Sequence, residues 1–382
     1  MDKETWCTRY LSEESPECLP LPDGREPGRG LILCLDAERG WVPGDRYALG
    51  FCTCGGEVAI CYDEGRYSPA FIRELLLAWG QILQSLRTAP SLDKVRVTSA
   101  ETEQRLNSFN DNAHDYDRQT TVVELFRQRA AEFPEHMAVI YEERAYTYAQ
   151  VEDMSDRLAV FLARQGLGRG DRVAVFIPRS EYMVIASLGV LKAGCAYEPL
   201  DPNYPDERLS FMAKDADVKV IIVADDLKPR LANFPDYKGL VLTISEVTGL
   251  PRATEEEIKR LEGPEPEDLF ILIYTSGTTG VPKGVRLLHS NLMCYAAWYR
   301  RYFAPTPETK VTCYNSYGFD GSLGDMYPIL TVGGTVVVVP EEKKLDLPAL
   351  AELIRRHGIS ISDMPSQVGR QFALTMDCPS LR

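Results

Sequence analysis

The feature of this sequence that most constrains its fold is an alternation of short β-branched runs with helical segments after residue 120. The runs "RVAVFI", "VKVIIVA", "LFILIY", "TVVVVP" and "ISISDM" lie at 172–177, 218–224, 269–274, 335–340 and 359–364. Helical patterns are predicted between them, near 181–193, 206–214, 288–302 and 346–357. Runs that are apolar on both faces, separated by helices, predict layered and mostly parallel sheets with flanking helices. The predicted fold class is therefore α/β.

Two helix starts open this α/β region, which we assign to residues 120–382. Thr121 and Glu124 have the spacing of a capping box, in which each side chain accepts a backbone N–H of the other residue. Thr147 is predicted to cap a second amphipathic helix, and Gly166 is predicted to end it.

Residues 1–98 have a different pattern and predict a small α+β region. The segments "YALGFC" and "EVAICY" flank "TCGG", which predicts a β-hairpin. Residues 69–87 place apolar side chains at helical spacing and begin with a proline, as helices often do. The stretch from Asn107 to Gln119 is polar and has no apolar period, so we assign residues 99–119 to a linker.

Charge and cysteine usage limit the classes of function. The net charge is −14 and no basic block is present, which argues against a nucleic-acid-binding surface. No apolar run reaches the roughly 18 residues of a membrane-spanning helix, so no membrane partner is expected. Cys52, Cys54 and Cys61 form a C-x-C pattern without a nearby His, which favours free thiols over a metal site. A cytoplasmic location is expected.

The segment "YTSGTTGVPKG" at 274–284 directly follows the apolar run "LFILI". In parallel α/β folds, ligands bind beyond the carboxyl ends of the strands. The segment combines glycines that let the backbone approach a ligand, hydroxyl donors and one cation. These are Gly277, Gly280 and Gly284, then Thr275, Ser276, Thr278 and Thr279, and finally Lys283. The combination predicts a phosphate-binding loop.

Two other interpretations of this loop were weighed. Its spacing does not match G-x-x-x-x-G-K-[ST], so it is not a Walker A loop. A solvated Ser/Thr/Gly connection is the commoner role for such a composition. The coincidence of several donor types after a buried strand favours phosphate binding here.

The same segment resembles the phosphate-loop signature of adenylate-forming enzymes. "YTYAQVEDMSDRLAVFL" and "LKAGCAYEPLDPNYPDERL" resemble the first two core motifs of the amino-acid adenylation domains of nonribosomal peptide synthetases, and "YGFDGS" at 317–322 resembles the fourth. The motifs follow one another in the expected order. The resemblance implies the large N-terminal subdomain of an adenylate-forming ligase.

This resemblance implies a reaction, its cofactors and its partners. An amino-acid carboxylate would attack the α-phosphorus of ATP, and a carrier-protein phosphopantetheine thiol would then take the acyl group. The work of such a site is to position the reactants and neutralise phosphate charge, with Mg²⁺ sharing that charge. By resemblance, the loop from Thr275 to Lys283 binds the β- and γ-phosphates, and Thr275 and Lys283 are the implied catalytic residues.

The resemblance also implies an amino-acid substrate. Asp320 matches the Asp that pairs with the substrate's α-ammonium group, and Gly321, Gly324 and Asp363 match positions that line the side-chain pocket. Two glycines would leave room, and Asp363 would favour a long or cationic side chain such as that of ornithine or lysine. The alternative is that Asp363 points elsewhere at a strand end.

Other expected segments are absent from the 382 residues. The resemblance implies an adenine-stacking N-x-Y-G-P-T-E segment, a T-G-D segment, a hinge and a lid that carries a catalytic Lys, and none of them occurs. Residues 1–98 resemble the C-terminal part of a condensation domain without its H-H-x-x-x-D-G motif. We therefore expect an incomplete adenylation domain that works with a downstream portion or synthetase subunit.

Two alternative functions stay open at this point. The chain could be a catalytically inactive nucleotide-binding fragment or scaffold of a synthetase. It could also be an acyl- or aryl-CoA ligase, against which Asp320 argues. Glu198 and Ser366 are minor departures from the family pattern, and His289 and His357 are expected to cap helices or to lie on helix surfaces.

Overall fold

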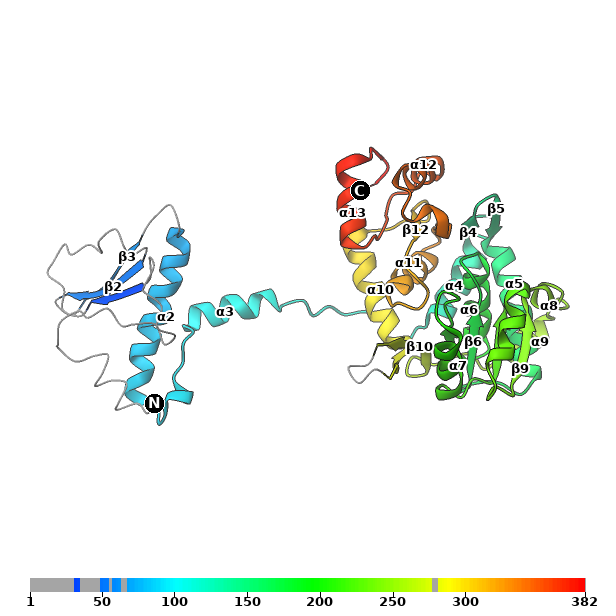
Figure 1. Cartoon of the computed structure of the whole chain (residues 1–382), viewed down its shortest axis with the longest axis horizontal. Helices are drawn as coiled ribbons and strands as arrows, with labels where there is room; N and C mark the ends of the chain where they lie inside the picture. Colours follow the sequence, from blue (N-terminus) through cyan, green and yellow to red (C-terminus); the bar gives the residue numbers. More distant parts are fainter. Residues whose placement is uncertain (1–30, 35–48, 55–56, 63–66, 277–280, 382) are drawn as a thin grey trace. The chain divides into compact units, whose positions relative to one another are not determined.

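The computed structural model describes residues 31–34, 49–54, 57–62, 67–276 and 281–381. The chain divides into two compact units, Met1–Asp115 and Tyr116–Arg382 (Figure 1). The two units are described separately below.

Among its described residues, the first unit contains a small sheet and the helices α2 and α3. Strand β1 (Leu31–Cys34) pairs parallel to β2 (Leu49–Cys54), and β2 pairs antiparallel to β3 (Glu57–Tyr62), so the predicted hairpin is confirmed. Helix α2 (Pro69–Thr88) confirms the predicted helix, and η1 (Leu92–Lys94) is a short 3₁₀ turn. The side chains of Cys52, Cys54 and Cys61 lie outside the described residues.

The predicted linker contains a helix that the polar composition did not indicate. Helix α3 spans Ala100–Phe109, so the first part of the segment that we assign to a linker is helical. The oxygen of the Ser99 side chain accepts the backbone N–H of Thr102, which caps the helix. Arg105 also forms an ion pair with Glu74 of α2. The helix therefore forms through its cap and its charged contacts, without a buried apolar face.

The second unit alternates helices and strands along the chain. Its elements are α4 (Val122–Glu132), β4 (Met137–Tyr141), β5 (Arg144–Thr147), α5 (Tyr148–Arg164), β6 (Arg172–Phe176), α6 (Tyr182–Lys192), β7 (Ala196–Pro199), α7 (Asp206–Asp215), β8 (Val220–Val223), η2 (Asp225–Asn233), β9 (Leu240–Thr243), α8 (Ile244–Thr248), α9 (Glu255–Lys259), β10 (Leu269–Thr275), β11 (Lys283–Leu288), α10 (His289–Phe303), β12 (Lys310–Cys313), α11 (Gly321–Leu330), β13 (Thr335–Val338), η3 (Glu341–Lys343), α12 (Leu347–His357) and α13 (Ser366–Thr375). Capping boxes at Thr121 and Thr147 begin α4 and α5, and Gly166 follows α5 with a φ of 82°.

The strands of this unit form two mostly parallel sheets, which confirms the predicted fold class. The six-stranded sheet has the order β11-β10-β7-β6-β8-β9, and the four-stranded sheet has the order β12-β13-β4-β5. Only the edge strands β11 and β5 run antiparallel to their neighbours. The predicted strand at 359–364 is wrong, because only an isolated bridge joins Ile361 to Val311. Pro365 follows this segment and precedes α13, so the chain leaves the sheet there.

Three apolar clusters cover the faces of the two sheets. The largest lies between the two sheets and includes Leu158 of α5 and Leu188 of α6. A second packs the other face of the six-stranded sheet against α7, and a third packs the four-stranded sheet against α12 and α13 (Figure 1). Sheets with apolar residues on both faces need such cover, which explains the near-continuous apolar runs of their strands.

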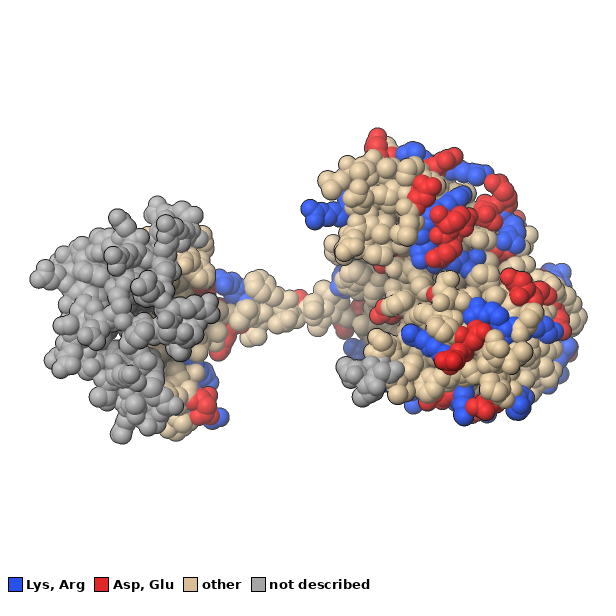
Figure 2. Space-filling view, in the orientation of Figure 1, with Lys and Arg blue, Asp and Glu red and all other residues tan. Residues whose placement is uncertain are grey.

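The surface of the second unit carries both signs of charge. Over the face shown in Figure 2, Lys and Arg side chains are interspersed with Asp and Glu side chains, and no broad basic area is visible. Within the described ranges, no helix combines the length and hydropathy needed to cross a bilayer.

Candidate active site

The predicted phosphate loop connects two adjacent antiparallel strands. Strand β10 ends at Thr275, β11 begins at Lys283, and these two residues lie opposite each other in the register. Gly277, Thr278, Thr279 and Gly280 lie outside the described residues. Thr275, Ser276 and Lys283 are exposed, and Lys283 forms no ion pair with any described residue. Both ends of the loop therefore present unused donors at the carboxyl end of a central parallel strand.

Tyr274 fixes the hairpin just before these donors. Its hydroxyl donates to the Asp215 carboxylate at the end of α7, with an O···O distance of 2.7 Å. Its ring lies against β11 at Gly284, where an added Cβ would come within 3.1 Å of the Tyr274 Cζ atom. Gly284 therefore lets β11 pass over the tyrosine ring, which is a requirement of packing in addition to backbone freedom.

A cavity of about 490 Å³ adjoins the hairpin. One part of its wall comes from β10 and β11, and another comes from the segment that precedes α11. A third part comes from the start of α7 and the turn before it. The lining residues are Tyr204, Arg208, Ile273, Tyr274, Thr275, Ser276, Val285, Leu287, Gly318, Phe319 and Asp320. The structure thus brings Thr275 and Ser276 to the same cavity as Asp320, 44 residues further along the chain than Ser276.

The backbone that leads to Asp320 is anchored by Asp325 of α11. The buried Asp325 carboxylate accepts the backbone N–H groups of Tyr314 (2.9 Å) and Asn315 (2.8 Å), and also the side-chain amide of Asn315. Burial, together with the negative charge of Asp363, raises the pKa of Asp325 to about 7, against the effect of these donors. Asp325 therefore fixes the backbone at the end of β12.

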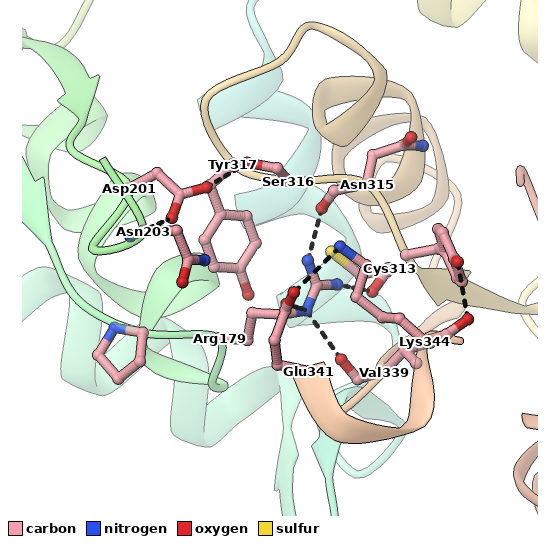
Figure 3. Close-up of polar contacts among 12 residues, drawn as sticks. Arg179, Asp201, Asn203, Cys313, Asn315, Ser316, Tyr317, Val339, Glu341 and Lys344 are labelled. Atoms are coloured by element: carbon pink, nitrogen blue, oxygen red, sulfur yellow. Dashed lines mark hydrogen bonds and ion pairs between the residues drawn. The ribbon is translucent and has the colours of Figure 1, made fainter. Parts of the chain in front are cut away.

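Arg179, which follows β6, holds the same segment from the side of the six-stranded sheet (Figure 3). Its Nε donates to the Val339 carbonyl (2.8 Å), and its Nη1 donates to the Asn315 carbonyl (2.7 Å). Its Nη2 donates to the carbonyl of Cys313. One guanidinium thus satisfies three backbone acceptors beyond the ends of β12 and β13.

Contacts of Ser316 and Tyr317 complete this arrangement. Together with the three Arg179 hydrogen bonds, we call them the Arg179 clamp. The Ser316 hydroxyl donates to Asp201, which follows β7 (Figure 3). The Tyr317 ring lies 5.3 Å from the Arg179 guanidinium carbon, and its hydroxyl donates to the Ser180 carbonyl (3.2 Å). Residues 313–317 are therefore bound to both sheets, and they deliver Asp320 to the cavity in a fixed position.

Asp320 itself differs from these residues because its carboxylate is unused. It immediately precedes α11, its side chain is exposed, and it makes no side-chain capping bond. Within the described part of the chain, no hydrogen bond or ion pair engages this carboxylate. An exposed carboxylate on a fixed backbone, facing a cavity with an aromatic wall, is suited to receive a cation.

The two glycines expected to line a side-chain pocket face other side chains of the protein. A Cβ at Gly321 would lie 2.9 Å from Cγ of Asn315, and a Cβ at Gly324 would lie 2.7 Å from the Tyr295 hydroxyl oxygen. Space at these positions is therefore occupied by an amide and a phenol, both of which lie close to carboxylates.

Asp363 lines a different cavity from Asp320. It borders a space of about 480 Å³ between the end of the four-stranded sheet and α13, with Met364, Phe372 and Met376. The Asn315 side-chain amide donates to the Asp363 carboxylate (3.4 Å). Burial raises the pKa of Tyr295, and the charges of Asp363, Asp325 and Asp320 raise it further, so all three carboxylates act on one phenol.

Sequence reasoning missed the residues that build the frame of this site. Asp325 carried a signal, since it is an acidic residue inside the otherwise apolar helix sequence "GSLGDMYPIL". Arg179 carried little signal, because its acceptors are backbone carbonyls that no side-chain pattern announces. The expectation of a capping or surface role for His289 is wrong: the ring is fully buried against Phe270 at 5.1 Å, and burial lowers its pKa to about 4.

No group of three or more His, Cys, Asp or Glu residues in the described ranges is arranged to hold a metal ion.

Comparison with known proteins identifies the family. The family model for AMP-binding enzyme matches residues 126–379. Bacitracin synthase 1 of Bacillus licheniformis is 34% identical over 286 residues, which are 75% of this chain and 5% of that protein. Surfactin synthase subunit 1 of Bacillus subtilis is 32% identical over 328 residues, 84% of this chain and 9% of that protein. The chain thus spans a small fraction of the curated relatives that it matches.

Solved structures agree on the fold. The nonribosomal peptide synthetase FmoA3, in its α-methyl-L-serine-AMP-bound form, superposes with a TM-score of 0.74 at 23% identity, covering 89% of this chain and 39% of that one. The four-domain nonribosomal peptide synthetase AB3403, bound to AMP and glycine, gives a TM-score of 0.75 at 22% identity, covering 86% and 24%. The chain therefore belongs to the AMP-binding enzyme family, and nonribosomal peptide synthetases are the relatives that it resembles.

Proposed function

We propose that this chain activates an amino acid as its aminoacyl-adenylate with ATP. The observation that carries this proposal is that one cavity is bordered by the Thr275 and Ser276 hydroxyls and by the unused Asp320 carboxylate. Donors suited to phosphate and an acceptor suited to ammonium therefore face the same space. A substrate with an ammonium group next to its carboxylate can reach both, whereas a fatty acid offers nothing to Asp320.

The residues of the chain divide the work of this reaction. Asp320 binds the α-ammonium group and thereby points the substrate carboxylate at the α-phosphorus. Thr275, Ser276 and Lys283 donate to the β- and γ-phosphates and stabilise the charge that passes to the pyrophosphate leaving group. Gly277, Thr278, Thr279 and Gly280 are assigned to the same phosphate contact from the sequence. Bound with the phosphates, Mg²⁺ supplies further neutralisation of that charge.

We also propose that the substrate side chain is cationic, as in ornithine or lysine. Asp363 and Asp325 both act on the Tyr295 phenol, and Gly321 and Gly324 keep backbone volume small on the same side. A side chain that displaces Tyr295 would enter an acidic environment, where a carboxylate needs a positive partner.

The proposed setting follows from the relatives. Adenylation in a nonribosomal peptide synthetase is followed by transfer to a phosphopantetheinylated carrier protein, which is therefore the proposed partner. The adenine-binding and lid segments that the resemblance implies are assigned to a further portion of a synthetase, which is a second proposed partner. The free thiols Cys195, Cys294, Cys313 and Cys378 support a reducing, cytoplasmic location.

Amino-acid-dependent exchange of pyrophosphate into ATP tests this function. The chain is assayed alone and with a second polypeptide that carries the C-terminal part of the adenylation domain of bacitracin synthase 1. Amino acids with cationic, acidic and apolar side chains are compared. We expect exchange only in the pair, with ornithine or lysine as the preferred substrate.

Two variants separate the proposed roles in this assay. Asp320→Ala should abolish amino-acid-dependent exchange without weakening the binding of pyrophosphate. Lys283→Gln should weaken pyrophosphate binding. Exchange with a preference for an apolar amino acid would reject the cationic assignment alone. Absence of exchange with every amino acid, in a pair that binds ATP, would favour the inactive nucleotide-binding scaffold.

A further inference from the structure

Arg208 is the one cation among the described residues that line the cavity, and the reaction derived above does not use it. It is the third residue of α7 and belongs to the segment "DPNYPDERL", to which the sequence analysis assigns no chemical role. We propose that Arg208 is a further phosphate-binding residue of this site, donating to the pyrophosphate portion of the nucleotide. This inference rests on the proposed function, since it assumes a nucleotide in the cavity.

The first support is that the Arg208 guanidinium has no anionic partner. Within the described residues, no carboxylate lies at ion-pair distance from it. Its Nε is buried without a hydrogen-bond acceptor, and one terminal nitrogen approaches the Tyr274 carbonyl at the long distance of 3.5 Å. A half-buried guanidinium with unused donors is costly to keep, unless a bound anion completes its contacts.

The second support is the position of the guanidinium beside the phosphate loop. The Tyr274 carbonyl that it approaches belongs to the residue immediately before Thr275 and Ser276, whose hydroxyls line the same cavity. Arg208, near the Tyr274 carbonyl, and Lys283, opposite Thr275, would thus provide two cations near the end of β10. A planar guanidinium can donate two parallel hydrogen bonds to a phosphate, which an ammonium group cannot.

The third support is that Arg208 is held in a defined orientation. Its guanidinium carbon lies 4.2 Å from the centre of the Tyr204 ring. The Tyr204 carbonyl accepts a hydrogen bond from Arg230 (3.2 Å), and its hydroxyl lies 2.7 Å from where a Cβ of Gly318 would be. The stacked ring fixes one face of the guanidinium and leaves its edge for an anion, so little rotamer entropy is lost on binding.

There are two competing possibilities. Arg208 could serve only to support Tyr204, or it could bind the carboxylate of the amino acid. Both are distinguished by titrating the full chain with pyrophosphate and Mg²⁺ in a calorimeter at two salt concentrations, without any amino acid. The variants are Arg208→Gln, Arg208→Lys and Lys283→Gln. Arg118→Gln is the matched control, because Arg118 also lies over a tyrosine ring, at 5.2 Å from that of Tyr116, but outside the cavity.

We expect Arg208→Gln to weaken pyrophosphate binding about tenfold and to reduce its salt dependence. Arg208→Lys should weaken binding about threefold, because the charge stays and the fork is lost. Arg118→Gln should bind like the unsubstituted chain. The lysine variant keeps the charge over Tyr204, so it still tests the fork if the glutamine variant does not fold.

Equal affinity in the unsubstituted chain and in Arg208→Gln would overturn the proposal, even if the variant unfolds at a lower temperature. Failure of the unsubstituted chain to bind pyrophosphate would overturn it as well. These outcomes are separate from failure of the proposed function. Pyrophosphate binding that depends on Arg208, in a chain that never supports amino-acid-dependent exchange, would keep the anion site and reject amino-acid activation.

Discussion

The two segments that border the cavity differ in whether other residues of the protein engage their polar groups. The β10–β11 hairpin ends in donors that no described residue engages, at Thr275, Ser276 and Lys283. The 313–317 segment has its polar groups engaged by the Arg179 clamp and by Asp325. A mobile, highly charged ligand such as triphosphate can be gathered by many available donors, whereas selection of one small molecule requires a fixed carboxylate. The difference shows that available donors and a rigid frame are separate ways to prepare a binding site.

Removing the Arg179 guanidinium should have the largest effect. In Arg179→Gln, the carbonyls of Asn315 and Val339 lose the guanidinium donor in a mostly buried place, and the Cys313 carbonyl keeps only the Val339 N–H. We expect the free energy of unfolding to fall by about 3 kcal/mol or more. Chemical denaturation measures this, with Arg118→Gln as the exposed control. An unchanged denaturation midpoint would mean that the segment is held by other contacts.

A substitution at Glu198 tests the stability of the six-stranded sheet next to the hairpin, because Glu198 lies on β7 and β7 pairs with β10. Its carboxylate is fully buried without a hydrogen-bond partner among the described residues, and burial raises its pKa from 4.5 to about 8. A carboxyl group with a raised folded-state pKa stabilises the fold below pH 4.5 and loses that contribution as the pH rises towards 8. Glu198→Gln should remove a pH-dependent loss on the order of a few kcal/mol.

The measurement is denaturation of both proteins at several pH values between 4 and 9. The difference between them isolates Glu198 from Asp325, whose pKa is also raised. Parallel curves for the two proteins would show that Glu198 finds a partner in solution.

Asp325 in α11 and Asp320 just before that helix are a matched pair, and they sharpen the comparison directly. Asp325→Asn places an amide against backbone N–H donors and should cost about 1–3 kcal/mol of unfolding free energy. Asp320→Asn should leave stability unchanged, because its carboxylate engages no described residue, and should reduce the affinity for the amino acid. Thermal unfolding and calorimetric titration measure the two effects. Equal destabilisation by both substitutions would contradict the proposed division between frame and contact.

Gly284 gives the smallest effect. An added Cβ would lie 3.1 Å from the Tyr274 ring, so Gly284→Ala should push β11 away from it. We expect a loss of about 1 kcal/mol or less in stability and a pyrophosphate affinity about threefold weaker. Gly168→Ala is the control, because no atom lies within 4 Å of a Cβ there. Equal behaviour of the two variants would show that the hairpin tolerates the displacement.

The parts of the fold that follow from local pattern were predictable. The capping box at Thr121, the helix after Thr147 and the strand before Thr275 each depend on residues a few positions apart. The strand at 359–364 is reduced to a bridge at Ile361, because the backbone hydrogen bonds to β12 stop after Ile361 and Pro365 has no N–H group to continue them. The helix after Ser99 was missed because its stabilising ion pair joins Arg105 to Glu74, far away in the sequence.

The site also contains residues that the sequence could predict and residues that it could not. Resemblance to family motifs proposed Thr275, Lys283 and Asp320, because motifs record the side chains that meet the substrate. The frame was not predictable, since Arg179 donates to backbone carbonyls of residues more than 130 positions later. Nor could spacing show that Asp320 and Asp363 border different cavities, because α13 decides that separation.

The Arg179 clamp has a consequence for how specificity can change. The Arg179 guanidinium donates to the main-chain oxygens of Cys313 and Asn315, so these bonds do not depend on the side chains at 321 and 324. Gly321 and Gly324 can then be exchanged for larger residues, together with Asn315 or Tyr295, without moving Asp320. Under the proposed function, substitution of the side chains around Asp320 would therefore change which amino acid is selected, while Arg179 keeps the backbone in place.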